Sequence, residues 1–381
     1  MMKCSDEARH WLEILSVRGI KITTWLSLCA RLGTIHVASM ISSRSGRREL
    51  SRLIRKDVVE PDYSMMRQIE LFLADADNGV LCISDPGYPD LLAETAEAPP
   101  VLFYRGNIKA ASGPAICIVG SRRSSRRGLV VARELAWELS RRGFLVVSGM
   151  ARGIDTVVHD GALAGGGETC AVLGCGIDIA YPPENAPLAL EIARHGCVLS
   201  EFPPGTPPMK HHFPMRNRIL SGMSFGVVVV EAKLASGAMI TARWAADQGR
   251  EVFAVPGPVE QETCRGPHRL IKEGACLVED VDDILAALPP CGRVVEESLG
   301  FHHYVGLDPG KGSLAGDEKR IVRALDLDPK HIDELAQICH ISSTVILPLL
   351  LDLEMRGIIE SCGGGTYALA GSWKDHAAGN F

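Results

Sequence analysis

The chain has 381 residues, of which 46% are hydrophobic and 23% are charged, and its formal net charge is −6. This length suits two or three domains, and the composition is that of an ordinary folded protein with a sizeable core. The sequence shows neither an apolar run of about 18 residues nor an apolar leader, so we expect no membrane span, no secretory signal and a cytoplasmic location.

The first 75 residues predict short helices. Trp11, Leu12, Ile14 and Leu15 recur near helical spacing, and a similar apolar pattern follows from Trp25. We therefore expect a small helical, SAM-like domain over residues 1–80. Residues 85–89 and 98–100 are rich in proline and glycine, and they predict a linker-like region after it.

The middle of the chain predicts a different class of structure. Short apolar runs rich in β-branched residues alternate with helix-length segments, which is typical of a mainly parallel sheet covered by helices on both faces. We expect a doubly wound α/β domain over residues 81–290, with its core at 113–287. The predicted strands are residues 116–119, 145–147, 170–173, 198–199, 227–230, 252–255 and 276–278.

A second linker is expected at residues 291–316, where glycine is frequent, and a small domain at 317–370. Two helices over 332–336 and 342–353, followed by a β-wing over 358–367, look like a winged helix. Such domains often bind DNA. Between residues 317 and 360, however, nine acidic residues outnumber five basic ones, so we favour contact with a protein.

The opposite charge balance marks residues 122–152, which hold eight arginines and two glutamates. The negative total argues against a nucleic-acid binder, but the distribution of charge matters more than the sum. The 12 cysteines are scattered without a C-x-x-C pair, and most lie in apolar segments. They predict no metal site, and we expect no cofactor.

Four loops at the carboxyl ends of the predicted strands carry unusual residues, and loops at this edge hold ligands in open α/β sheets. They are residues 120–122 (Gly-Ser-Arg), 148–155, 213–218 (Phe-Pro-Met-Arg-Asn-Arg) and 231–241. The last leads through Ser-Gly into a predicted helix, whose N-terminus offers an anion site. We expect the arginines of these loops to meet at one sheet edge, where they would suit a polyanion.

Each loop also has a purely structural explanation. Gly120 and Gly149 would close strand-to-helix turns, and Asp155 would cap a helix. Glu231 would pair with an arginine of residues 213–218. His159, one turn beyond Asp155, is interpreted as a helix-face histidine rather than a catalytic base.

Taken together, the loops closely resemble the DprA (Smf) family, the DNA-processing proteins of bacterial natural transformation. The resemblance covers nearly all of the central domain, and the flanking helical and winged-helix segments agree with the long form of the family. The matching stretches, in chain order, are residues 118–122, 148–155, 171–178 with 181–182, 200–203, 213–218, 229–232, 256–257 and 270–275. Met215 departs from the family pattern, since that position is often basic.

The resemblance implies an extended Rossmann-like domain that binds single-stranded DNA without sequence preference and without enzymatic turnover. It also implies protection of incoming strands, loading of the RecA recombinase, and a homodimer formed through the Rossmann-like domains. Single-strand-binding protein is a further candidate partner.

The expected phosphate-binding residues come from the four loops and from the family's pocket, to which Lys210 is added by its proximity in sequence. Supporting roles are expected for Asp155, Phe213 and Glu231. The phosphate-binding set is Gly120, Ser121, Arg122, Ser148, Gly149, Arg152, Lys210, Arg216, Asn217, Arg218, Ser236, Gly237 and Thr241.

Two other functions remain open at this point. One is a nucleotide hydrolase of the phosphoribohydrolase type, which shares a related domain, although residues 235–241 lack the P-G-G-x-G-T loop of that class. No G-x-x-x-x-G-K-[ST] motif supports nucleotide binding either. The other is a winged-helix regulator of duplex DNA, which the acidic C-terminal segment disfavours.

Overall fold

The computed structural model describes residues 4–288 and, beyond them, residues 321, 324–325, 329–339, 341, 346, 349–350, 353–354, 358–363 and 366–369. The chain divides into two compact units, Met1–Phe301 and His302–Phe381. The linker expected over residues 291–316 lies outside the described residues. In the described part of the chain, no helix is long and apolar enough to cross a membrane.

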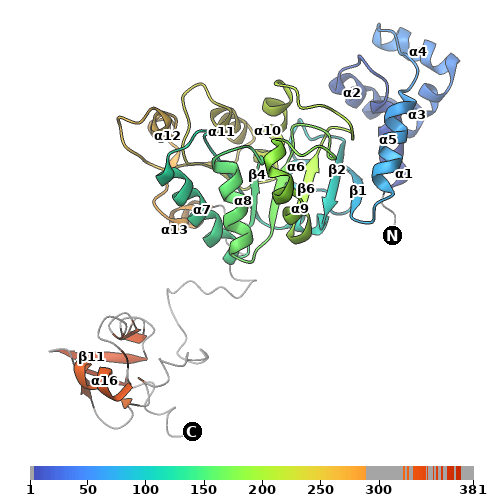
Figure 1. Cartoon of the computed structure of the whole chain (residues 1–381). Coiled ribbons are helices and arrows are strands. Elements are labelled where there is room, and N and C mark those ends of the chain that lie inside the picture. Colours follow the sequence, from blue (N-terminus) through green and yellow to red (C-terminus); the bar gives the residue numbers. More distant parts are fainter. Residues whose placement is uncertain are drawn as a thin grey trace. The chain divides into compact units, whose positions relative to one another are not determined.

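The first unit begins with helices, as the apolar spacing predicted (Figure 1). They are α1 (Asp6–Leu15), α2 (Ile22–Leu32), α3 (Thr34–Ser42), α4 (Arg44–Ile54) and α5 (Tyr63–Leu73). Polar caps fix where they start: Ser5 Oγ accepts from Ala8 N at 3.1 Å, and Asp62 accepts from two backbone N–H groups of α5. Their apolar faces bury Trp25 and Ile41 in a common core.

A nine-stranded sheet forms the centre of this unit, in the order β1-β2-β6-β5-β4-β3-β7-β8-β9. All seven predicted strands are confirmed, and they pair in parallel. Every residue of β3 to β7 is buried, as expected for a sheet covered on both faces. The seven are β3 (Ala115–Val119), β4 (Leu145–Ser148), β5 (Thr169–Val172), β6 (Cys197–Ser200), β7 (Gly226–Val229), β8 (Glu251–Ala254) and β9 (Cys276–Leu277).

The linker-like interpretation of residues 85–100 is wrong. This segment, with the short helix α6 (Asp90–Ala93), connects two strands, β1 (Asn78–Cys82) and β2 (Val101–Gly106), that extend the sheet. Strand β2 pairs antiparallel with β6, and β1 pairs antiparallel with β2. The prolines and glycine shape the connection between the strands rather than separating two domains.

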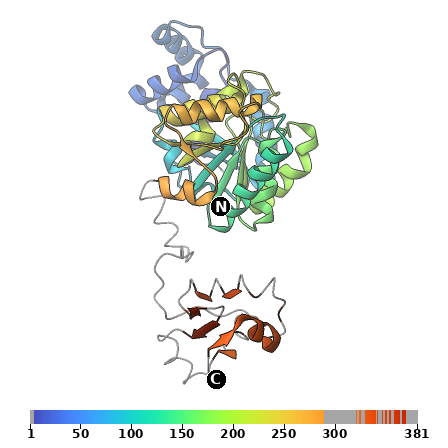
Figure 2. The ribbon, with the colours of Figure 1, turned by 90° about the vertical axis from the view of Figure 1, so that its left-hand side faces the viewer.

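Helices cover both faces of the sheet (Figures 1 and 2). Helices α7 (Arg126–Arg141), α8 (Ile154–Ala164) and α13 (Val281–Ala287) share one core with one face. Helices α10 (His212–Gly222), α11 (Gly237–Asp247) and α12 (Arg265–Lys272) share another core with the opposite face, and α9 (Ala186–His195) packs near β2, β5 and β6. Short 3-10 turns lie at Ile108–Ser112, Pro183–Asn185 and Glu262–Cys264.

The chain changes direction across the sheet at β3. From β3 it proceeds through β4 and β5 to β6, and it then returns to place β7 on the other side of β3. The connections leaving β3 and β7 therefore diverge to opposite faces. Such a switch point opens a crevice beyond the carboxyl ends of the two strands.

Residues 213–218 were expected to form a loop, and the structure shows that this is wrong, since they lie in α10. Pro214 does not prevent the helix because it falls in the first turn, where its missing N–H has no intrahelical partner. This difference decides where the two arginines of the segment point.

The second unit contains β10 (Lys330–His331), α16 (Ile332–Cys339), β11 (Ile359–Gly363) and β12 (Thr366–Leu369). Its strands form a sheet in the order β10-β12-β11, over a core that includes Leu335, Leu350 and Ile358. The predicted helix at 332–336 and the β-wing are confirmed. Much of the helix expected over 342–353 lies outside the described residues.

Candidate functional site

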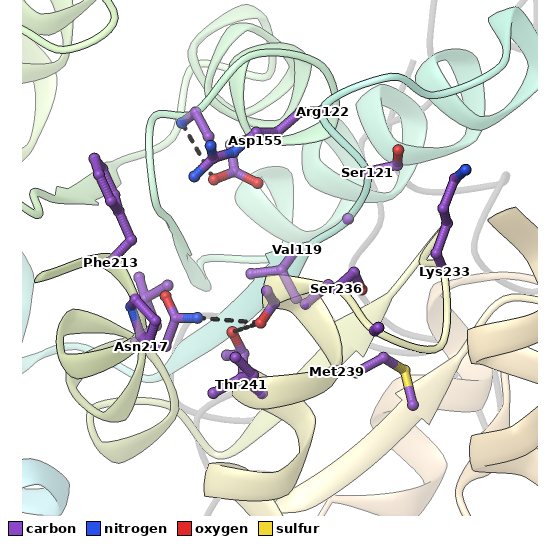
Figure 3. Close-up of a pocket in the computed structure, with 18 of the residues that line it drawn as sticks. Val119, Ser121, Arg122, Asp155, Phe213, Asn217, Lys233, Ser236, Met239 and Thr241 are labelled. Atoms are coloured by element: carbon purple, nitrogen blue, oxygen red, sulfur yellow. Dashed lines mark hydrogen bonds between the residues drawn. The ribbon is translucent and has the colours of Figure 1, made fainter. Parts of the chain in front are cut away.

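A cavity of about 910 Å³ opens at the switch point, between the ends of β3 and β7 and the first turns of α10 and α11 (Figure 3). Its walls are built from the segment after β3, from α10 and from the loop that leads into α11. All four segments expected to converge meet here, although the loop after β4 contributes only Ala151 and Asp155.

The rim of the cavity is cationic. Arg122, Arg123, Lys210 and Arg243 line it and are exposed, and within the described residues none of them forms an ion pair with a carboxylate. A fifth cation, Lys233, reaches Glu262 at 2.6 Å. Asp155 is the one acidic residue among the described lining residues. The cavity therefore favours an anionic ligand.

Arg216 lies beneath this rim and is only 3% exposed. Its Nη1 donates to Gly149 O at 2.9 Å and also to Val172 O, so the guanidinium ties α10 to β5 and to the loop after β4. A Cβ atom at Gly149 would lie 2.5 Å from Arg216 Nη2 and 2.7 Å from Asp155 Oδ2. Only glycine fits between these two charged groups.

Asp155 is also buried, and its Oδ2 accepts from Ala151 N at 3.2 Å. Burial raises the pKa of the Asp155 carboxyl, against the opposing influence of the Arg216 charge. Burial likewise lowers the pKa of Arg216, although a guanidinium keeps its proton at neutral pH. Asp155 and Arg216 thus form the floor of the cavity.

Arg218 is turned away from the cavity. It makes two hydrogen bonds with the carboxylate of Glu201, at 2.6 and 2.8 Å, and donates to the carbonyl of Glu97 at 3.0 Å. The expected pairing of Glu231 with an arginine of this segment is wrong, because Arg218 meets Glu201 and Arg216 meets backbone carbonyls.

Glu231 instead holds the N-terminus of α7. Its carboxylate accepts from Ser125 N at 3.0 Å and from Ser125 Oγ at 2.5 Å. It also accepts from Gln261 at 2.9 Å and Thr263 at 3.0 Å. The loop after β3, which carries Arg122 and Arg123, is thereby fixed to the neighbouring strand connection.

The N-terminus of α11 forms one wall. Asn217 Nδ2 and Thr241 Oγ1 both donate to Gly237 O, at 3.1 and 3.2 Å, and so position the first turn (Figure 3). Ser236 Oγ, at the N-cap position, is buried and has no hydrogen-bond partner among the described residues. A helix N-terminus with an unused hydroxyl suits a phosphate oxygen.

An aromatic pair forms the opposite wall. The rings of Tyr181 and Phe213 lie 5.6 Å apart between centroids, and Arg122 Cζ lies 5.3 Å from the centroid of Phe213. Tyr181 is 38% exposed, so part of its ring remains available for stacking. Flat apolar surfaces beside unpaired cations suit a ligand with both aromatic rings and phosphates.

The cavity brings together most of the expected residues but not all of them. Ser148 is buried and donates to Ile118 O, while Arg152 pairs with Glu184 outside the cavity. Gly149, Arg218 and Glu231 are also absent from the lining. The expected residues that line it are Gly120, Ser121, Arg122, Asp155, Lys210, Phe213, Arg216, Asn217, Ser236, Gly237 and Thr241.

Among the lining residues that sequence reasoning missed, four have charged or aromatic side chains. Arg123 follows directly after the loop at residues 120–122, and Lys233 lies within the loop at 231–241. Tyr181 lies within a matched stretch. Arg243 carries no signal of its own, because its place depends on which face of α11 borders the cavity.

His159 lies in α8 and is fully buried. Its Nδ1 is 2.7 Å from Thr169 Oγ1, which itself donates to Val146 O, so the imidazole donates to the hydroxyl. Burial, reinforced by the charge of Arg216, lowers the pKa of His159 to about 3. The side chain is a neutral core histidine rather than a pocket base.

A pH dependence of stability follows from His159. In the unfolded chain its pKa is about 6.5, so between that value and about 3 the unfolded state binds the extra proton. The contribution is complete above pH ~6.5 and falls by about 1 kcal/mol for each pH unit below it. Urea unfolding at pH 7.5 and pH 5 should show this loss, and His159→Gln should reduce it. If the free energy of unfolding fell equally between pH 7.5 and pH 5 in both proteins, His159 would not be the source of the loss.

The fold and the cavity define a doubly wound α/β protein with a cationic ligand pocket at its topological switch point. The family model described as DNA recombination-mediator protein A matches residues 79–289, and the DprA winged helix domain matches residues 307–365. The chain belongs to the DprA (Smf) family of DNA-processing recombination mediators.

Individual relatives agree with this family. Protein Smf of Escherichia coli is 33% identical over 93% of this chain and 94% of its own length. The structure of DNA processing protein A from Streptococcus pneumoniae aligns with a TM-score of 0.62 and 34% identity, covering 76% of this chain and 99% of that one. The homologue from Helicobacter pylori, described with a single-stranded DNA binding mode, aligns with a TM-score of 0.50 and 27% identity, over 59% of this chain and 97% of its own.

Proposed function

We propose that this protein binds single-stranded DNA in the switch-point cavity, protects it, and loads the RecA recombinase onto it during natural transformation. The observation that carries the proposal is the group of exposed, unpaired cations at the rim, namely Arg122, Arg123, Lys210 and Arg243, beside the aromatic wall. The single-stranded DNA binding mode of the Helicobacter pylori relative supports the same ligand.

The geometry suits binding without sequence preference. Rim cations and the first turn of α11 would contact phosphates, which are the same for every base. Tyr181 and Phe213 would stack on base faces, and every base has such a face. The proposal includes no catalytic turnover, because Asp155 is held in the floor by Arg216 and by backbone donors rather than free to act as a base.

Partners of the complex are part of the proposal. We place the protein in the cytoplasm, as a homodimer formed through the central domains, with single-strand-binding protein as a further contact on the coated strand. The acidic winged-helix domain is assigned to a protein contact.

A RecA loading assay tests the function directly. On single strands already coated with single-strand-binding protein, substoichiometric amounts of this protein should shorten the lag of RecA filament formation at least tenfold, because it would hold bare strand for RecA. Filament growth is followed by the ATPase activity of RecA. Release of free base from nucleoside monophosphates, without any effect on the lag, would favour a hydrolase instead.

A further inference from the structure

Helix α7 carries a stripe of exposed residues along its outer face, made of Arg126, Val130, Arg133, Trp137 and Arg141. Their spacing of four, three, four and four positions places all five on one side of the helix. The opposite side, with Ala132, Leu135 and Leu139, is buried against the sheet. We call these five residues the α7 stripe.

The cations of the α7 stripe have no carboxylate partner in the described part of the chain, although Arg141 lies over the ring of Trp137. Within the described residues, none of Arg126, Arg133 and Arg141 pairs with a carboxylate, whereas the adjacent Arg142 pairs with Asp282 at 2.5 Å. Burial raises the pKa of Asp160 in α8, and the charge of Arg133 opposes that effect, but these two side chains form no ion pair. Among the described residues, two exposed acids lie beside the stripe, Glu134 of α7 and Asp160 of α8, so the three arginines leave it net positive.

The α7 stripe begins at the rim of the cavity. Ser125 caps α7, and Arg122 and Arg123, just before it, line the cavity. Glu231 fixes this junction through Ser125. From there the helix continues for 16 residues, about 24 Å, so its cations lead away from the cationic rim along the helix. Figure 1 shows α7 on the outside of the sheet.

Trp137 gives the stripe a stacking surface. It is 37% exposed, and Arg141 Cζ lies 4.7 Å from its ring centroid. An exposed tryptophan is unusual on a charged helix, and an aromatic face flanked by arginines is the arrangement that binds bases and phosphates of a single strand together.

We propose that a single strand leaving the cavity continues along the α7 stripe, with its phosphates on Arg126, Arg133 and Arg141 and a base on Trp137. This inference rests on the proposed function. The proposed binding site is therefore longer than the cavity. Its first part is the deep cavity with the aromatic wall, and its second part is the open α7 stripe, where binding is sensitive to salt.

The test compares a six-nucleotide with a 24-nucleotide oligothymidylate, using fluorescence anisotropy. The variant Arg126→Gln/Arg133→Gln/Arg141→Gln should bind the long strand about 10- to 100-fold more weakly, and the salt slope should fall by about 2, at roughly 0.7 for each lost phosphate contact. The short strand, which fills only the cavity, should bind as before. Tryptophan fluorescence should be quenched by the long strand in the wild type and much less in Trp137→Phe.

A matched control removes the same charge elsewhere. Arg44, Arg48 and Arg52 are exposed on α4, and Arg44→Gln/Arg48→Gln/Arg52→Gln should leave both strands bound as in the wild type. Equal weakening by both triple variants would reduce the effect to net charge and overturn the inference. So would unchanged long-strand binding, which would leave the stripe to an acidic protein partner. If the unmodified protein bound neither the short nor the long strand, the proposed function itself would be refuted.

Discussion

Replacing Arg216 with alanine is expected to lower the free energy of unfolding by about 3–5 kcal/mol. The substitution leaves the Asp155 carboxylate buried without the charge that most opposes its desolvation. It also leaves Gly149 O and Val172 O without their donor, and unsatisfied buried acceptors are costly. Urea unfolding at pH 7.5, followed by circular dichroism, measures the change.

The double variant Arg216→Met/Asp155→Asn serves as the control. Because it removes both buried charges, it should regain part of the lost stability, even though the two carbonyls stay unpaired. A single Arg216→Ala variant as stable as the wild type would show that the cavity floor does not depend on this arginine. The result also matters for binding studies. Weaker DNA binding by this variant would reflect the lost structural contacts of Arg216 beneath the cavity rather than a lost phosphate contact.

The second large effect concerns binding. The variant Arg122→Gln/Lys210→Gln is expected to bind single-stranded DNA about 10- to 100-fold more weakly, and the salt slope should fall by about 1.4, at roughly 0.7 for each phosphate. Both residues are exposed and lack ion-pair partners in the described part of the chain, and Arg122 loses only its contact with the Phe213 ring, so stability should fall by no more than about 1 kcal/mol. Anisotropy of a labelled oligothymidylate between 50 and 200 mM salt gives both quantities.

The matched control for this variant is Arg152→Gln/Arg269→Gln. It removes two positive charges that pair with Glu184 and Glu273 and that lie outside the cavity. It should bind DNA nearly as tightly as the wild type. If it lost as much affinity as Arg122→Gln/Lys210→Gln, the cavity would not be the main binding site, and Arg152 would regain the role that its sequence position suggested.

The strands could be predicted because each is a short apolar run whose burial on both faces leaves a direct mark in the sequence. The two strands within residues 78–106 were not predicted, because the proline and glycine residues of their connection made the segment resemble a linker. The convergence of loops followed from one rule, that parallel strands end at the same sheet edge. It therefore located the cavity correctly.

The roles of single arginines could not be predicted in the same way. Arg216 and Arg218 are two positions apart, which in a loop would let both face one ligand. In a helix the same spacing turns them about 200° apart, so one enters the core and the other meets Glu201. Which partner satisfies each arginine depends on contacts with distant segments, and no local pattern records those.

Gly149 shows how misleading a binding assay alone would be for this protein. It never meets the ligand cavity, yet the missing side chain is what allows Arg216 and Asp155 to approach each other beneath it. Under the proposed function, a substitution at Gly149 would weaken DNA binding by displacing Arg216 and Asp155, although Gly149 does not line the cavity. The importance of Gly149 thus comes from the room it leaves for its neighbours and from its carbonyl, which accepts from Arg216, rather than from a side chain.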